Sequence, residues 1–177
     1  MIMDAGRFQI VEATTPGAMS RIVAMHAAYY SREHGMGKPF ERKVAEGLAE
    51  FWPRLMNPRN RLWLATTPSQ GDQIVGSIAI DGEDLGAGQA HLRWFFLDDG
   101  CRGQGVGSAL LRRAIEFVDK ERFTHTVLWT FKGLDAARHL YERNGFRLVN
   151  EYAGAQWGVN LMEQRFEREA IEAGSAG

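Results

Sequence analysis

Apolar residues recur at two spacings along the chain, and the change between them separates predicted strands from predicted helices. Short runs rich in aromatic and β-branched residues predict about seven strands, over residues 8–13, 61–66, 73–80, 89–97, 124–130, 146–149 and 159–166. Apolar positions three to four apart predict about four helices: one opened by Thr15 and Pro16, one over residues 39–52, one after the glycines at 103–107, and one over residues 134–144. This order predicts an α/β (α+β) domain with a mixed, mostly antiparallel central sheet flanked by helices.

The most specific polar pattern lies between the strand over residues 89–97 and the following helix. Asp98 and Asp99 end the strand, and Gly103, Gly105 and Gly107 precede an amphipathic segment. Glycines let backbone N–H groups point together at an anion, just where the helix dipole is positive. Arg102 adds a permanent cation, so the predicted guest is a phosphate or pyrophosphate. The alternative is that the glycines only turn the chain.

The spacing of these glycines excludes two common phosphate-binding motifs. No Gly-Lys-Ser/Thr string of a P-loop occurs, and the sixth position counted from Gly103 is Ser108 rather than the glycine of a dinucleotide fingerprint. The remaining pattern, Arg102-x-x-Gly105-x-Gly107 before a leucine-rich helix, resembles the pyrophosphate loop of the GNAT superfamily of acyl-CoA-dependent N-acetyltransferases.

A second stretch strengthens this resemblance. Ala137-x-x-Leu140-Tyr141-x-x-x-Gly145-Phe146 has the form of the family's second conserved block, a short helix that leads into another strand. Residues 128–137 and 156–158 further resemble the acetyltransferase half of proteins that fuse a MarR-type DNA-binding domain to a GNAT domain. The resemblance implies the GNAT fold and acetyl-CoA as cosubstrate.

The family pattern also implies where the cosubstrate binds. The backbone of Phe95 and Leu97 would pair with the pantetheine arm, and the Leu97 N–H would polarise the thioester carbonyl. Many family members anchor the pantetheine with an asparagine where this chain has Leu134, so that contact is missing here. Arg138 would lean toward the phosphates, or else lie on a solvated helix face. The expected set is Phe95, Leu97, Arg102, Gly103, Gln104, Gly105, Val106, Gly107, Ser108, Ala137 and Arg138.

Tyr141 is the predicted general acid. It stands four residues after Ala137 on the same helical face, where the family commonly places the tyrosine that protonates the leaving thiolate. The alternative is a core aromatic residue.

His91 is the predicted general base, because it alternates with Arg93 and Phe95 on the strand that enters the site and an imidazole titrates near neutral pH. The alternative is an ordinary surface or core histidine, and the rival bases are Glu33, Glu41 and Glu83. Cys101, near a helix N-terminus beside Arg102, would suit a covalent acyl-enzyme if its pKa were lowered, but its place within the phosphate loop argues against that role.

Aromatic residues near the predicted site indicate an acceptor pocket. Residues 29–38 are predicted to form a substrate-facing loop, with a solvated connector as the alternative. Trp157 is expected to be exposed on a contact surface over residues 156–166, which would suit a homodimer. The residues expected to line the pocket are Tyr29, Tyr30, His34, Phe40 and Trp129.

Composition narrows the remaining possibilities. The length of 177 residues fits one domain, expected over residues 1–167 with a frayed tail over 168–177. With 21 basic and 22 acidic residues, no charge excess favours nucleic acid or a membrane. A single cysteine and the absence of a signal-peptide pattern favour a cytoplasmic location. The five histidines lack metal-ligand spacing, so no metal is expected.

Two functions from different classes follow. The first is transfer of the acetyl group of acetyl-CoA to a primary amine of a small molecule, an amino acid or a protein, by direct attack in a ternary complex. The alternative is a non-catalytic acyl-CoA-binding module with a regulatory or interaction role.

Overall fold

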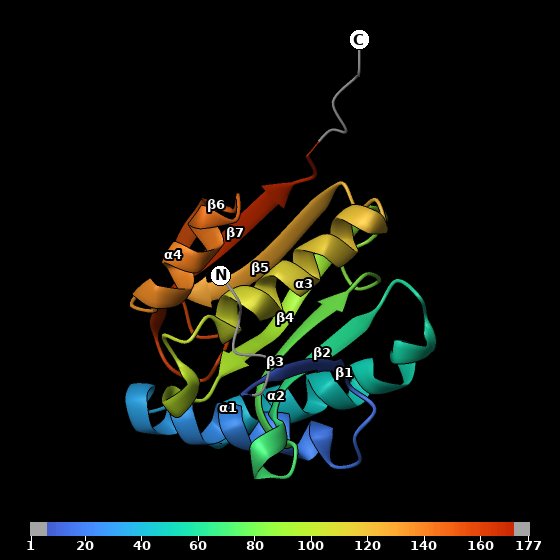
Figure 1. Cartoon of the computed structure of the whole chain (residues 1–177). Coiled ribbons are helices and arrows are strands. Elements are labelled where there is room, and N and C mark those ends of the chain that lie inside the picture. Colours follow the sequence, from blue (N-terminus) through green and yellow to red (C-terminus); the bar gives the residue numbers. More distant parts are fainter. Residues whose placement is uncertain (1–6, 172–177) are drawn as a thin grey trace.

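A seven-stranded sheet forms the centre of the computed structural model, which describes residues 7–171 (Figure 1). Its strand order is β1-β2-β3-β4-β5-β7-β6, and all neighbours are antiparallel except the parallel pair β4 and β5. The mixed, mostly antiparallel sheet predicted from the sequence is therefore confirmed. The strands are β1 (Gln9–Glu12), β2 (Arg61–Thr67), β3 (Gln73–Asp81), β4 (Gln89–Leu97), β5 (His125–Phe131), β6 (Arg147–Gly154) and β7 (Leu161–Glu169).

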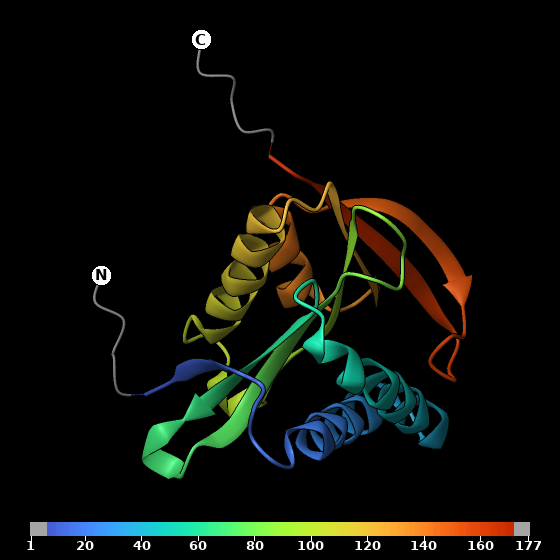
Figure 2. The same ribbon diagram turned by 90° about the vertical axis from the view of Figure 1, so that its right-hand side faces the viewer.

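Helices cover both faces of the sheet, as the nearly edge-on view in Figure 2 shows. The helices α1 (Ala18–His34) and α2 (Lys38–Phe51) pack on one face, and α3 (Val106–Lys120) and α4 (Asp135–Arg143) lie on the other. Each face has its own apolar core. No helix of the described residues is long and apolar enough to span a membrane.

The predicted and observed helix boundaries differ most at α1. Gly17, not Thr15, stands at its N-cap, and the helix runs to His34, where Gly35 donates its N–H to the Ser31 carbonyl. The loop predicted over residues 29–38 is therefore wrong for its first six residues, which form the last turns of α1, and for Lys38, which begins α2. Tyr29 and Tyr30 have modest helix propensities, but their packing against Phe96 of the sheet stabilises the helix here.

A bulge bends β4 at the centre of the sheet. Ser77 pairs with Phe96 and Ala79 with Arg93, so two β4 residues stand opposite one residue of β3. Trp94 at the bulge has a φ of 47°, and the Ser77 hydroxyl donates to its carbonyl at 2.7 Å. β4 pairs with β5 only from Gln89 to His91, so the rest of their facing edges is left open.

The end of β7 corrects the predicted domain boundary. The strand continues to Glu169, and Arg168 is only 5% exposed, so residues 168 and 169 belong to the folded domain rather than to a frayed tail. The Arg168 guanidinium donates to both oxygens of Asp119 on α3, at 2.8 and 2.9 Å. Residues 172–177 of the predicted tail lie outside the described residues.

Replacing Arg168 by methionine tests this link between β7 and α3. Arg168→Met keeps the aliphatic stem but removes two charge-assisted hydrogen bonds, and Asp119 is partly exposed and can be rehydrated. We expect the free energy of unfolding to fall by about 1–3 kcal/mol, measured by urea denaturation. Arg147→Met is the control, because the Arg147–Glu169 pair is exposed and should contribute less than about 1 kcal/mol. Equal losses in the two variants would contradict a structural role for Arg168.

Candidate active site

Two cavities meet where β4 and β5 part. The first, of about 470 Å³, lies between the glycine loop and α4, and we call it the donor groove. The second, of about 260 Å³, lies between α1, α2, β4 and β5, and we call it the acceptor cavity. Both are bordered by Tyr30, Phe95, Leu134 and Ala137, so the two spaces share one wall.

The glycine loop places unpaired backbone donors beside the donor groove. Gly105 stands at the N-cap of α3 with a φ of 80°, a conformation that a side chain would strain. The first helical bond runs from Ala109 to the Gly105 carbonyl at 3.0 Å, and no side chain in the described chain caps this end. The N–H groups of residues 106–108 are therefore left to an anion or to water.

The residues predicted for this loop do not all face the groove. Gly103, Gly105, Gly107 and Ser108 border it. The Gln104 amide instead donates to the Gly100 carbonyl at 2.9 Å, and the Val106 side chain is buried in the core, so these two can contribute only backbone groups.

Arg102 is held at the mouth of the donor groove. Its guanidinium lies 4.6 Å from the centroid of the Tyr29 ring, and its Nη1 donates to the Tyr29 hydroxyl at 3.3 Å. Its Nε lies 3.3 Å from both the Leu97 carbonyl and an Asp99 carboxylate oxygen. These contacts hold a partly exposed cation beside the glycine loop, where it can meet a phosphate.

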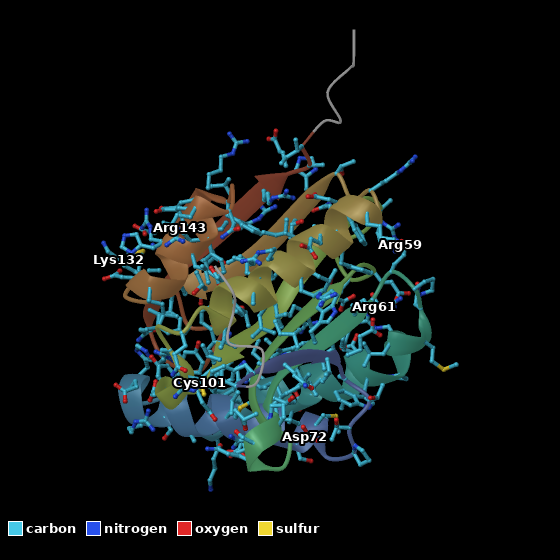
Figure 3. The ribbon with its side chains drawn as sticks, in the orientation of Figure 1. Arg59, Arg61, Asp72, Cys101, Lys132 and Arg143 are labelled. Atoms are coloured by element: carbon cyan, nitrogen blue, oxygen red, sulfur yellow. The ribbon has the colours of Figure 1, made fainter. Side chains whose placement is uncertain are left out.

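The prediction that Arg138 reaches the phosphates is not supported by its placement. Arg138 donates to Glu142 at 2.8 Å and lies over Phe166, on a face of α4 that does not border the groove. His139 and Arg143, which the sequence analysis missed, border the groove instead (Figure 3 shows Arg143 on α4). Asp135, His139 and Arg143 follow one another at intervals of four residues, which puts all three on one helical face, and that spacing was the signal available in the sequence.

The open edge of β4 supplies backbone groups to the donor groove. Asp98 donates its N–H to the Val75 carbonyl of β3 at 2.8 Å. Successive peptide groups of a strand point to opposite sides, so the N–H of Leu97 points away from β3, toward the gap between β4 and β5. Phe95 and Leu97 border the groove, where their backbone was predicted to act.

Aromatic side chains line the acceptor cavity, although not all those predicted. Tyr30, Phe40 and Trp129 border it. Tyr29 borders the donor groove only, and His34 borders neither cavity because its ring packs on Phe131 with centroids 4.9 Å apart.

Trp157 also borders the acceptor cavity and packs on Phe131, with ring centroids 5.7 Å apart. The expectation that Trp157 is exposed is therefore wrong, because the side chain is partly buried. The contact surface over residues 156–166 and the homodimer stay predictions. Lys43 of α2 donates to the carbonyl of Gln156, so the β6–β7 turn closes this side of the cavity.

Tyr141 borders the acceptor cavity and is almost fully buried. Its ring packs on Phe95, Phe146 and Phe166 with centroids about 6 Å apart, and the residue is 6% exposed. Burial, with a smaller contribution from Tyr30, raises the pKa of Tyr141 above the usual range of a tyrosine. The phenol therefore keeps its proton at neutral pH, as a general acid requires.

Burial likewise raises the pKa of Tyr30 to about 12, with Tyr29 adding to the shift. The shared wall of the two cavities is therefore uncharged at neutral pH.

His91 borders the acceptor cavity as predicted for a base. Its Nδ1 lies 2.6 Å from a carboxylate oxygen of Asp84, and its ring centroid lies 4.9 Å from that of Trp129. The rival carboxylates do not border either cavity within the described chain: Glu33 pairs with Arg32, Glu83 contacts Arg54, and Glu41 is exposed.

Cys101 does not have the lowered pKa that a nucleophile would need. Burial first, and the nearby Asp98 second, raise the pKa of its thiol. Cys101 is the last residue of η3 (Asp99–Cys101; Figure 3) and does not line either cavity.

Within residues 7–171, no three His, Cys, Asp or Glu side chains gather as a metal-binding group.

Comparison with known proteins gives matches that cover part of each protein. The chain is 32% identical to "N-acetylaspartate synthetase" of Danio rerio over 130 residues, which cover 73% of this chain and 45% of that protein. It is 28% identical to "Probable N-acetyltransferase family 8 member 5" of Mus musculus over 121 residues, covering 66% of this chain and 53% of the relative. The chain thus spans about half the length of the curated relatives it matches.

Solved structures share the fold at low sequence identity. An acetyltransferase of the GNAT family from Staphylococcus aureus Mu50 superposes with a TM-score of 0.72 at 18% identity, covering 93% of this chain and 99% of that one. The family model described as "Acetyltransferase (GNAT) family" matches residues 22–146. That match covers the diverging strands β4 and β5, the glycine loop and α4, and it shows that the chain belongs to the GNAT acetyltransferase family.

Proposed function

We propose that this protein transfers the acetyl group of acetyl-CoA to a primary amine by direct attack in a ternary complex. The observation that carries this proposal is the meeting of the donor groove and the acceptor cavity over the open edge of β4, with Tyr141 facing the acceptor cavity. The acceptor class extends to small molecules, amino acids and protein amino groups.

The donor groove fits the parts of acetyl-CoA in turn. The free N–H groups at the start of α3 and the guanidinium of Arg102 suit a pyrophosphate, and Arg143 adds a second cation from α4. The open edge of β4 suits an amide-bearing arm that completes the missing strand pairing. Leu134 borders both cavities where many family members have an asparagine, so an apolar wall replaces a polar anchor.

The proposed reaction forms one bond and breaks one. The acceptor ammonium first loses a proton to His91, and the free amine attacks the thioester carbon, whose carbonyl oxygen accepts from the Leu97 N–H. As the N–C bond forms and the C–S bond breaks, Tyr141 gives its phenolic proton to the sulfur that leaves. The second proton lost by the nitrogen restores Tyr141 through solvent.

Two features of the acceptor side bear on the amine that it would take. Aromatic rings make up much of the cavity wall, which suits an apolar or aromatic body, and Lys43 and Arg93 border the same cavity, which suits an anionic group on the acceptor. One relative bears the name "N-acetylaspartate synthetase", and an amino acid is among the acceptor classes of this proposal. The similarity to the acetyltransferase half of MarR–GNAT fusion proteins stays a prediction from residues 128–137 and 156–158.

Ligand-induced stabilisation tests the donor groove. At a hundredfold excess over Kd, acetyl-CoA should stabilise the protein by about 2.7 kcal/mol, or roughly 5–10 °C in Tm for a chain of this size. Arg102→Glu should remove at least half of this shift, because it places a carboxylate where the phosphates bind. Arg113→Glu, an equal charge change at an exposed position of α3, is the control and should keep the shift. An unchanged Tm of the wild type at millimolar acetyl-CoA would contradict the proposal.

Replacing Tyr141 by phenylalanine tests the chemical step. We expect kcat to fall by about 10²–10⁴-fold while the affinity for acetyl-CoA changes little, because the packed ring is kept and only the acid is lost. The assay is thiol release from acetyl-CoA with 2-phenylethylamine, tryptamine, L-phenylalanine, L-aspartate and an alanine-initiated peptide. Tyr152→Phe, at a tyrosine 38% exposed and outside both cavities, should retain full activity. Acetyl-CoA binding without thiol release from any amine would favour the non-catalytic acyl-CoA-binding module.

A further inference from the structure

We propose that Asp84 is a positioning residue that holds His91 in the tautomer needed to accept a proton from the acceptor amine. This inference rests on the proposed acetyl transfer but assigns a residue that neither the family match nor the sequence pattern indicates. The juxtaposition that carries it is the 2.6 Å contact between Asp84 Oδ2 and His91 Nδ1 at the wall of the acceptor cavity.

The contact with Asp84 determines which ring nitrogen of His91 is free to accept a proton. A carboxylate accepts hydrogen bonds, so the proton of a neutral His91 ring lies on Nδ1, facing Asp84. Nε2 then carries the lone pair. Because His91 borders the cavity and packs edge-on against Trp129, the ring is held there by a polar contact at Nδ1 and an aromatic contact at its side.

The loop that carries Asp84 is held in place at its start, by contacts of Asp81 and Gly82. Asp81, at the end of β3, is fully buried and accepts two hydrogen bonds of 2.6 Å from Arg54. Gly82 donates to Asn60 at 2.8 Å, and a Cβ at this glycine would lie 2.6 Å from the Arg59 carbonyl oxygen, so the backbone can approach this closely only at glycine. These contacts hold the chain two residues before Asp84.

Asp81, where this loop begins, is ionised and forms ion pairs with Arg54 and Arg93. Burial alone would raise the pKa of Asp81, but hydrogen bonds from Arg54 and the charge of Arg93 leave it lowered overall. Arg93 lies 3.3 Å from Asp81 and 3.6 Å from Asp84, so one guanidinium links the buried carboxylate to the one beside His91.

Other titratable groups that border the same cavity do not replace Asp84. Lys43 of α2 is engaged with Gln156, and Tyr30 and Tyr141 keep their protons because burial raises their pKa values. Burial lowers the pKa of His26 to about 4, so this ring is neutral at pH 7. Asp84 is therefore the carboxylate in contact with His91, and Arg93 is the nearest cation shown beside that carboxylate.

The proton transfer follows from this arrangement. The acceptor ammonium gives one proton to His91 Nε2, and the ring becomes an imidazolium whose Nδ1–H still faces Asp84. The amine keeps its electron pair for attack on the thioester, and the ring later releases the proton to solvent.

The test reads the tautomer directly and needs no acceptor. Long-range ¹H–¹⁵N spectra of the full chain, with the His91 signals identified by their loss in His91→Gln, should show Nδ1 protonated and Nε2 unprotonated in the wild type at pH 8. Asp84→Asn should abolish this preference, because an amide can also donate to Nδ1 and select the other tautomer. Glu83→Gln, on the same loop, is the control: its amide oxygen still accepts from Asn60 and it does not touch His91.

Kinetics then connect the tautomer with turnover. With an amine that the wild type acetylates, Asp84→Asn should lower kcat/KM at least about tenfold, because Nε2 of His91 is then no longer held as the nitrogen that accepts the proton of the amine. Glu83→Gln should stay within about twofold of the wild type.

Three results would overturn the proposal: a wild-type His91 protonated on Nε2, a tautomer unchanged in Asp84→Asn, or equal kinetic losses in the Asp84 and Glu83 variants. A protein without acetyltransferase activity would overturn the proposed function. The spectra need no turnover, so they would still decide whether Asp84 sets the tautomer of His91.

Discussion

The site depends on the parting of β4 from β5. These strands pair over three residues and then diverge, and a bulge at Trp94 bends β4 at the point of divergence. A continuous sheet would satisfy the backbone groups of Phe95 and Leu97 with a neighbouring strand. The divergence leaves them facing a groove instead, and it opens the floor of both cavities at the same place.

The shared wall of the cavities explains how the same residues serve packing and chemistry. Phe95 packs on Tyr141, and Tyr141 packs on Phe146 and Phe166, within one apolar core on the α3 and α4 side of the sheet. Burial of Tyr141 next to this wall raises the pKa of its phenol. The exclusion of water also strengthens the effect of any backbone dipole that meets the thioester. The packing that stabilises the fold therefore also raises the pH at which the phenol would lose the proton that the proposed reaction needs.

Local patterns predicted the elements that depend on near neighbours in the chain. The spacing of Phe40, Val44, Leu48 and Phe51 indicates a helix with one apolar face, and all four residues are buried in α2. The glycines before α3 predicted a strand, a loop and a helix in that order, and the described structure has that order. The binding of an anion by this loop stays a prediction. The last turns of α1 and the end of β7 were missed, because Tyr29, Tyr30 and Arg168 take their conformation from residues far away in the chain.

The sequence by itself determined the order of strands and helices, the glycine loop with Arg102, and the helical face shared by Ala137 and Tyr141, because each rests on spacing within a few residues. Only the tertiary structure decided which side chains reach the cavities. Arg138 turns away while Arg143 faces the groove, and Trp157 closes the acceptor cavity from a turn more than sixty residues after His91. The contact of Asp84 with His91 likewise depends on a loop held by Arg54 from a distant part of the chain. Such contacts are made across the fold, and no local pattern along the chain encodes them.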